Sequence, residues 1–304
     1  PSGDQSFPNF SSGLHSVSLS DEGVDLLGSP ILGSDHFMES FVSSKVSKVK
    51  LMQDLLADLE NPQVALHLLR SCLGQCKIIH LLRTLPVNIA AQAFSDFDTN
   101  LQLSLEAILY TSLDEHAWAK ATLPFSLGGL GIRTAAQSRI PAFLGSRFSS
   151  RDLFLHLTSQ VPSSPNCSFF FEEAVATKTL KLSVPEADPC SPQHTLQRSL
   201  DVHAFNSLKQ SLCVRDQARL NTIASSSAGA WLRAIPNPNL GLAMLPQEFV
   251  LASRMWLGVK IFPSPPNSIR CHCGQVIDAF GDHLLGCGHG PLRIKRHDAL
   301  RDII

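Results

Sequence analysis

The apolar residues of segment 37–59 recur every three or four positions, and this spacing constrains the fold more than any other feature of the sequence. Side chains spaced in this way share one face of an α-helix, so the segment predicts an amphipathic helix whose apolar face packs into a core. Ser34 or Asp35 can cap the start of this helix. Asn61 and Pro62 predict the N-cap and the first position of the next helix.

Similar patterns, separated by glycine and proline, run along most of the chain and predict a mainly α fold. Residues 23–32 differ, because a short apolar run closed by glycine and proline is typical of a strand and a turn. Segment 123–133, LPFSLGGLGIR, predicts a loop with unusual backbone angles. Further helices are expected at 64–82 with a break at Gly74, at 89–110, at 112–118 from a capping box at Ser112, from Thr134 with a kink or restart at Pro141, at 195–226, and from Pro246.

The composition excludes several classes of protein. Lys and Arg number 25 against 26 Asp and Glu, so any contact with nucleic acid needs a local basic patch and does not involve the whole surface. No apolar run reaches the roughly 18 residues of a membrane span, and the N-terminus lacks the features of a signal peptide. We therefore expect an intracellular protein, nuclear or cytoplasmic. Residue 1 is proline and the last residues, RHDALRDII, stop inside an amphipathic pattern, so we expect a fragment of a longer chain.

Three of the eight cysteines lie close together near the C-terminus, beside histidines, which is the distribution of a metal site. Cys271 and Cys273 belong to a tight turn in which Gly274 can take a positive φ. His283 and Cys287 are four residues apart and would share one face of a helical turn. Three thiolates and one imidazole suit tetrahedral zinc and leave no open position, so the pattern predicts a structural zinc site.

The alternative for this segment is three small buried cysteines and a surface histidine without a metal ion. Two further histidines, His272 and His289, are available as substitute ligands. Asp278 or Asp282 could support the ligands through hydrogen bonds.

Two other patterns favour packing over chemistry. Cys72 and Cys76 are four residues apart, with His67 and His80 nearby, and we expect them on the core face of a helix and not at a second metal site. The GGLG sequence lacks the lysine and the Ser/Thr of a phosphate loop, so a tight turn is expected. The three tryptophans are expected to anchor helix packing: Trp118, Trp231 and Trp256.

Basic residues gather in two places. Among the first helices, flexible side chains can reach phosphates while the apolar stripe packs inward, and the candidates are Lys45, Lys48, Lys50 and Arg83. Residues 291–304 carry four basic residues against two acidic ones, and the basic ones are Arg293, Lys295, Arg296 and Arg301. This second group is interpreted either as a solvated helix face or as a phosphate contact beside a metal-bound element.

Several blocks resemble the C-terminal part of the reverse transcriptases of non-LTR (LINE-type) retrotransposons whose endonuclease follows the polymerase. VDLLGSPIL is similar to the end of the palm near the primer grip, and LLRSCLGQCKIIHLLRTLP with ATLPFSLGGLGIRTA resembles the helical thumb. Four further blocks resemble the family's linker, its zinc knuckle and the start of its endonuclease. In chain order they are AWLRAIPNPNLGLAM, EFVLASRMWLGV, CHCGQVIDAFGDHLLGC and RIKRHDALRD. The blocks follow the family's order over about residues 20–304, and the resemblance is weakest at 150–225.

The resemblance implies a helical thumb and linker bundle that binds an RNA or DNA primer–template, with a small C-terminal zinc knuckle. Its Cys-Cys-His-Cys order implies zinc ligation by Cys271, Cys273, His283 and Cys287. The implied parts are a palm remnant at 1–33, a thumb-like domain at 34–160, a variable linker at 161–195, a helical linker domain at 196–265, and the knuckle with the start of the endonuclease at 266–304.

Neither catalytic site of the family carries over to this chain. The polymerase site needs a pair of adjacent aspartates, and no Asp-Asp dipeptide occurs here. The acidic and lysine residues of the endonuclease would lie beyond Ile304. The resemblance thus implies a non-catalytic fragment of an RNA-directed DNA polymerase, and whether the chain has an activity of its own is left open. No small-molecule substrate is evident.

Two other interpretations remain. A stand-alone helical, zinc-containing scaffold for protein partners is favoured by the net charge of -1 and the 44% of hydrophobic residues. A decayed remnant without activity is the third interpretation.

Overall fold

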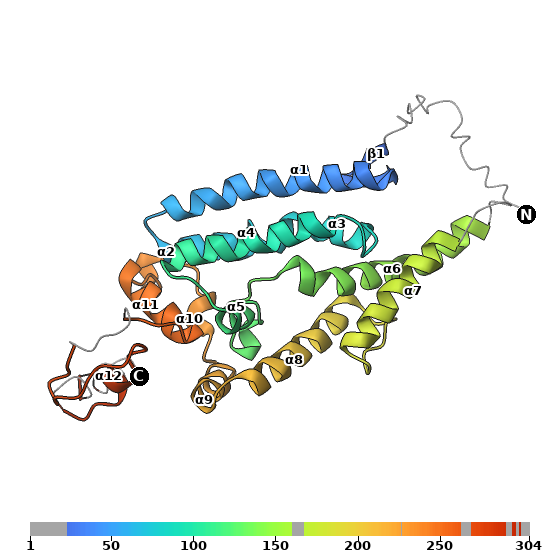
Figure 1. Ribbon diagram of the computed structural model, residues 1–304. Helices are drawn as coiled ribbons and strands as arrows, with labels where there is room; N and C mark the ends of the chain where they lie inside the picture. The colour runs from blue at the N-terminus through green and yellow to red at the C-terminus, as the bar shows by residue number, and fades with distance from the viewer. Residues whose placement is uncertain are drawn as a thin grey trace, which may run out of the picture.

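The structure is a computed structural model, and it describes residues 23–159, 167–225, 227–262, 269–289, 294, 295 and 298. Helices account for most of these residues (Figure 1). A two-stranded antiparallel sheet precedes them, so the prediction of a mainly α fold is confirmed. Among these residues, no helix combines the length and the apolar character that crossing a membrane requires. In chain order the elements are β1 (Gly23–Leu26), β2 (Ser29–Gly33), α1 (Asp35–Asp54), α2 (Pro62–Ser71), α3 (Ile79–Thr84), α4 (Ala91–Leu109), α5 (Glu115–Ala121), α6 (Ala135–Ser159), α7 (Cys167–Ser183), α8 (Gln193–Ser211), α9 (Val214–Ile223), α10 (Ala230–Arg233), α11 (Pro246–Leu257) and α12 (Asp282–Gly286), with short 3-10 turns at 55–58, 75–77, 125–127 and 238–240.

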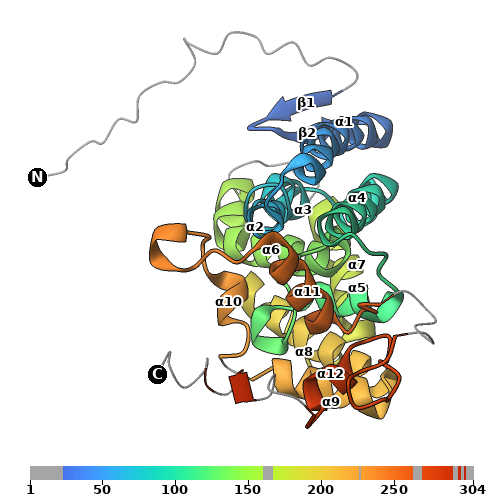
Figure 2. The ribbon, with the colours of Figure 1, turned by 90° about the vertical axis from the view of Figure 1, so that its left-hand side faces the viewer.

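The strand and turn predicted at 23–32 form a β-hairpin. Leu27 and Gly28 both take positive φ, which suits a two-residue hairpin turn. The hairpin is held to α3, because the His80 ring hydrogen-bonds the carbonyl of Gly28 at 3.1 Å and the hydroxyls of Ser29 and Thr84 lie 2.5 Å apart. It therefore lies beside the first helices and is not an isolated ribbon (Figure 2).

The caps of the first two helices are confirmed. The Ser34 hydroxyl accepts from the N–H of Phe37 at the start of α1, and the side-chain amide oxygen of Asn61 accepts from the N–H of Val64 at the start of α2. The prediction of a capping box at Ser112 is wrong, because Asp114 caps α5 and the helix begins at Glu115.

The displaced start of α5 has a physical cause. Tyr110 ends α4 in the left-handed conformation, and the chain then buries Leu113, which is only 7% exposed, before the helix can begin. The N–H of Leu113 is satisfied by the carboxylate of Glu106 at 2.9 Å. Burial of one leucine thus moves the helix start by two to three residues.

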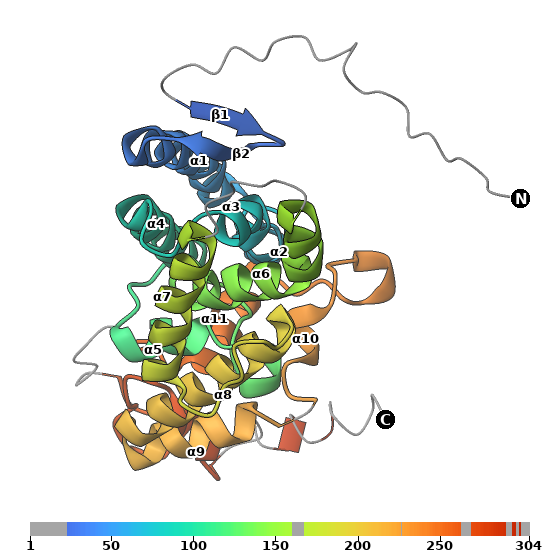
Figure 3. The ribbon, with the colours of Figure 1, turned by 90° about the vertical axis from the view of Figure 1, so that its right-hand side faces the viewer.

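The prediction of one helix over 195–226 is also wrong. Helix α8 ends at Ser211, Leu212 and Cys213 are extended, and α9 begins at Val214. Leu212 is 7% exposed and belongs to the main core, so the break turns its side chain inward. The break also lets α9 leave in a new direction (Figure 3).

Helix α4 contributes many side chains to the main core; it lies beside α1 and contacts α2, α6 and α11 (Figures 2 and 3). Its side chains Phe97, Leu101 and Leu105 have no exposed surface. A second, smaller core joins α6, α7 and α8, and its buried residues are Phe143, Leu144, Ala176, Leu180, Ala187 and Leu196. The described residues thus contain two separate clusters of buried apolar side chains.

The glycine-rich segment forms the predicted loop. Gly128 and Gly131 have φ of 80° and 70°, which L-residues with a side chain rarely adopt. The indole N–H of Trp256 donates to the carbonyl of Gly128 at 2.8 Å. Trp256 and Trp231 pack edge to face at 5.8 Å, and Trp118 is partly buried against the same core, so the tryptophans do anchor helix packing.

Cys72 and Cys76 do not lie on the core face of a helix, and that prediction is wrong. Both are exposed, because α2 ends at Ser71 and residues 75–77 form a 3-10 turn. The i,i+4 argument fails since no continuous helix connects the two residues.

Candidate metal centre

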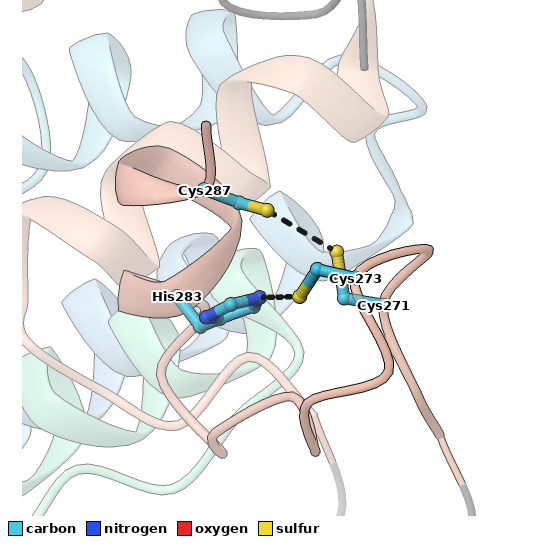
Figure 4. Close-up of side chains that lie close together, drawn as sticks. All are labelled: Cys271, Cys273, His283 and Cys287. Carbon is cyan, nitrogen blue, oxygen red and sulfur yellow. Dashed lines mark hydrogen bonds between the residues drawn. The ribbon is translucent and has the colours of Figure 1, made fainter. Parts of the chain in front are cut away.

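Four potential ligand atoms of the C-terminal segment lie within 4.8 Å of one another. They are the Sγ atoms of Cys271, Cys273 and Cys287 and a ring nitrogen of His283, which point toward a common centre (Figure 4). This is the set that the sequence predicted, and it could hold a metal ion.

Cys271 and Cys273 are presented by a tight turn. The N–H of Cys271 donates to the carbonyl of Gln275 at 2.9 Å, and the N–H of Gly274 donates back to Cys271 at 2.8 Å. Gly274 has a φ of 85°, as the sequence predicted for this position. An isolated bridge between Arg270 and Val276 closes the turn, so both thiols project from one short hairpin-like unit.

His283 lies on α12, and Cys287 directly follows the last residue of that helix. The N–H of Cys287 donates to the carbonyl of His283 at 2.8 Å, which is the i,i+4 bond of a helical turn and places both side chains on one face. Asp278 fixes the start of this turn, because its carboxylate accepts from the N–H groups of Phe280, Asp282 and His283 at 2.9, 3.1 and 2.7 Å. Burial alone would raise the pKa of Asp278, but these N–H groups lower it below its usual value.

The distances suit four ligands around one small ion. The sulfurs of Cys271 and Cys287 are 3.6 Å apart, and Nε2 of His283 is 3.2 Å from the sulfur of Cys273. A tetrahedral zinc with Zn–S bonds of about 2.3 Å separates its sulfurs by about 3.8 Å. Three sulfurs and one imidazole nitrogen form a soft donor set that fits such an ion.

The thiols influence each other's ionisation. The backbone of Cys273 and the His283 ring lower the pKa of Cys271 to about 6. The backbone of His289 lowers the pKa of Cys287, but desolvation and the neighbouring thiols outweigh it and raise that pKa overall. These shifts favour ionisation of Cys271 over that of Cys287, and the thiolate is the form that binds metals.

The substitute ligands named from the sequence lie outside the cluster. His272 is exposed and is not among the grouped ligand atoms. His289 lines a surface hollow of about 450 Å³ beside Cys273 and His283. Among the described residues, the set of four is therefore the ligand set that the geometry supports.

Asp282 attaches the centre to the helical body. Its carboxylate accepts from Nε of Arg215 and, at 3.1 Å, from Arg219, both on α9. The Arg215 guanidinium also lies 3.9 Å from the centroid of the Phe280 ring. No sequence signal pairs residues 63 and 67 positions apart, so this contact could not be predicted.

Backbone bonds and one buried side chain complete the attachment. The N–H groups of Ile261 and Phe262 both donate to the carbonyl of Ala279, at 2.8 and 3.0 Å. Ile277 is only 6% exposed. The ligand-bearing segment therefore packs against the helical body and is not connected to it only through the chain.

The structure does not gather the predicted phosphate-binding residues of the thumb-like part on one surface. Lys48 is exposed on α1, while Lys45 lies 5.5 Å from the centroid of the Phe41 ring. Lys50 lines a groove between α1 and α4 and pairs with Asp54 at 2.7 Å. Arg83 lies elsewhere, on α3, and donates to Gln193 at 2.9 Å.

The basic residues predicted in the C-terminal tail are described only in part. Lys295 is exposed and helical, whereas Arg293, Arg296 and Arg301 lie outside the described residues. The electrostatics of the tail therefore remain a sequence-based prediction.

Comparisons of the chain with family models, with curated proteins and with solved structures give no significant match.

Proposed function

We propose that the chain is a zinc-bearing, non-catalytic C-terminal part of a non-LTR retrotransposon reverse transcriptase, and that it binds an RNA or DNA primer–template. The observation that carries the proposal is the convergence of Cys271, Cys273, His283 and Cys287, in the Cys-Cys-His-Cys order of that family's knuckle. The nuclear or cytoplasmic location expected from the sequence belongs to the same proposal.

The ion proposed here is a structural zinc. Three thiolates and one imidazole close the tetrahedron, so no position is left for a substrate or a reactive water. The ligand segment is small and buries few side chains of its own, Ile277 being one of them. Metal binding therefore supplies folding free energy that this segment lacks.

The proposed role in nucleic-acid binding is positional. Because Asp282 ties the knuckle to α9, the zinc site would hold the tail in a fixed direction relative to the helical body. Lys48 and Lys45, three residues apart on α1, are the exposed and partly exposed lysines that we propose to contact the backbone of the bound strand.

The experiment measures binding of a fluorescent primer–template duplex to the zinc-loaded chain between 50 and 200 mM salt. Phosphate contacts predict an affinity that falls steeply over this range, because binding releases counterions. Lys48→Gln is expected to weaken binding and to reduce the slope of log K against log salt by about 1. Lys178→Gln, which removes an exposed lysine on α7, is the matched control.

An affinity that does not change with salt, or equal effects of the two substitutions, contradicts the proposed contact. If the folded, zinc-loaded chain binds no nucleic acid even at the lowest salt, the interpretation as a scaffold for protein partners replaces this proposal.

A further inference from the structure

Three basic side chains from distant parts of the chain meet on the helical body, away from the metal centre. His67 and Arg70 belong to α2, and Arg233 is the last residue of α10. A hydrogen bond joins the two helices at this place, since Nη1 of Arg70 donates to the carbonyl of Leu232 at 3.2 Å. Leu232 is the residue before Arg233, so this bond brings Arg233 close to Arg70.

Arg70 is held in place by its surroundings. Its guanidinium lies 4.7 Å from the centroid of the Phe125 ring, at the start of the glycine-rich loop. That loop approaches closely, because a Cβ at Gly131 would lie 3.0 Å from the Phe125 ring and 3.3 Å from Cδ of Arg70. A cation so positioned has lost much of its side-chain entropy before any ligand arrives.

The orientation of the His67 ring follows from the same contact. Nη2 of Arg70 lies 3.0 Å from Nδ1 of His67. A guanidinium can only donate, so Nδ1 accepts and the ring proton lies on Nε2. A ring that accepts through Nδ1 is neutral and offers its Nε2–H as a donor. Desolvation and the charge of Arg70 both lower the pKa of His67, which favours this neutral form.

No carboxylate balances this cluster within the described ranges. The ion pairs there do not involve Arg70 or Arg233, whereas Arg133 pairs with Asp201 and Arg147 with Glu172. Burial first and then the charge of Arg233 lower the pKa of Arg70, so the neighbouring charge repels this cation. Folding thus brings like charges together without an acidic partner from the described chain.

The cluster keeps donors for a ligand. Two N–H groups of Arg70 are used, for Leu232 and His67, out of the five that a guanidinium carries. Arg233 is exposed, and His67 and Arg70 are partly exposed, so solvent reaches the cluster. Two guanidinium groups and an imidazole N–H match the oxygens of a phosphate, which only accept when fully ionised.

We infer that His67, Arg70 and Arg233 form a binding site for a phosphate group, whether a free phosphate or a phosphodiester of a nucleic-acid strand. Arg70 and Arg233 supply charge and paired N–H donors, and His67 supplies one neutral donor. The proposed phosphate site depends neither on the zinc site nor on the resemblance to reverse transcriptases. A negative result for phosphate binding would therefore leave both of those proposals unaffected.

The experiment follows the Cε1–H signal of His67 by NMR while inorganic phosphate is added to the zinc-loaded full chain at pH 7.5 and constant ionic strength. Loss of the signal in His67→Gln assigns it among the 12 histidines. We expect a saturable shift in the wild type. Arg233→Gln should weaken phosphate binding about tenfold, as expected for loss of one charge-assisted contact.

Arg198→Gln is the matched control, because it removes an exposed arginine of α8 and the same charge without touching the cluster. Arg70→Gln should abolish the shift, and its thermal melting curve separates loss of the site from loss of the fold. Because Arg233 is exposed, Arg233→Gln is expected to fold. It therefore tests the site even if Arg70→Gln unfolds.

A competing oligonucleotide without terminal phosphates distinguishes the two sources. Displacement of inorganic phosphate by the oligonucleotide identifies a phosphodiester backbone as the ligand, and absence of displacement identifies a free phosphate. An unshifted His67 signal, or equal phosphate affinity in Arg233→Gln and the wild type, would overturn the inference.

Discussion

Lys120 provides a test of how α5 and α11 are held together. Its side chain is 2% exposed, and its ammonium group donates to the carbonyl of Leu257 at the end of α11 at 2.8 Å. Burial lowers its pKa from 10.5 to about 8, an effect that the nearby Asp216 only partly opposes. A charged group without a carboxylate in direct contact is thus buried where α5 meets α11.

The shift in the pKa of Lys120 gives the free-energy cost of burying its charged ammonium group. A shift from 10.5 to about 8 corresponds to about 3 kcal/mol of lost stability. Below pH 8 the lysine is charged in both the folded and the unfolded chain, so the full cost is present. Between pH 8 and 10.5 the folded chain has released the proton while the unfolded chain keeps it, so the wild type becomes more stable as the pH rises.

Lys120→Met keeps the length of the side chain and removes the titration. Urea unfolding of both proteins at pH 7, 8, 9, 10 and 10.5 gives the difference in free energy of unfolding. We expect this difference to move by about 3 kcal/mol in favour of the wild type between pH 7 and 10.5. Loss of the hydrogen bond to Leu257 lowers the stability of Lys120→Met by the same amount at every pH. It therefore does not alter how the stability difference varies with pH.

Lys178→Met, which removes an exposed lysine of α7, controls for the loss of one positive charge. Parallel stability curves for Lys120→Met and the wild type over this pH range would refute the reasoning.

Three further substitutions test local features by urea unfolding. Burial raises the pKa of Asp98 to about 6, so the wild type should lose about 2 kcal/mol relative to Asp98→Asn as the pH rises from 4 to 6, and curves that stay parallel would contradict this. Gly129→Ala should cost roughly 2–4 kcal/mol, because the new Cβ would collide with the carbonyl of Leu123, whereas Gly286→Ala has open space and should cost less than about 0.5 kcal/mol. Trp256→Phe should cost about 1–2 kcal/mol, because a buried carbonyl loses its indole donor, and an unchanged stability would argue against that bond.

Features set by neighbouring residues could be predicted from the sequence. Asn61 and Pro62 start α2 as expected, because a cap needs only the next three residues. The four metal ligands were found for the same reason, since a tight turn and an i,i+4 pair each bring two of them together. Only the meeting of the two pairs required the tertiary structure.

Features set by distant residues could not be predicted in this way. The break between α8 and α9 occurs because Leu212 is drawn into the core, which no local pattern reveals. Arg215 finds Asp282, and Arg70 finds Leu232, across 67 and 162 residues. Such pairings depend on how the helices pack.

Our central proposal is that Cys271, Cys273, His283 and Cys287 together bind one zinc ion, and the zinc content of the purified chain tests it most directly. Mass spectrometry under native conditions should find about one zinc per chain in the wild type, as a closed four-ligand site requires. Cys190→Ser, at an exposed cysteine outside the cluster, should keep that zinc, and Cys273→Ser should lose it. A wild-type chain without zinc, or equal zinc content in the two variants, would contradict the account.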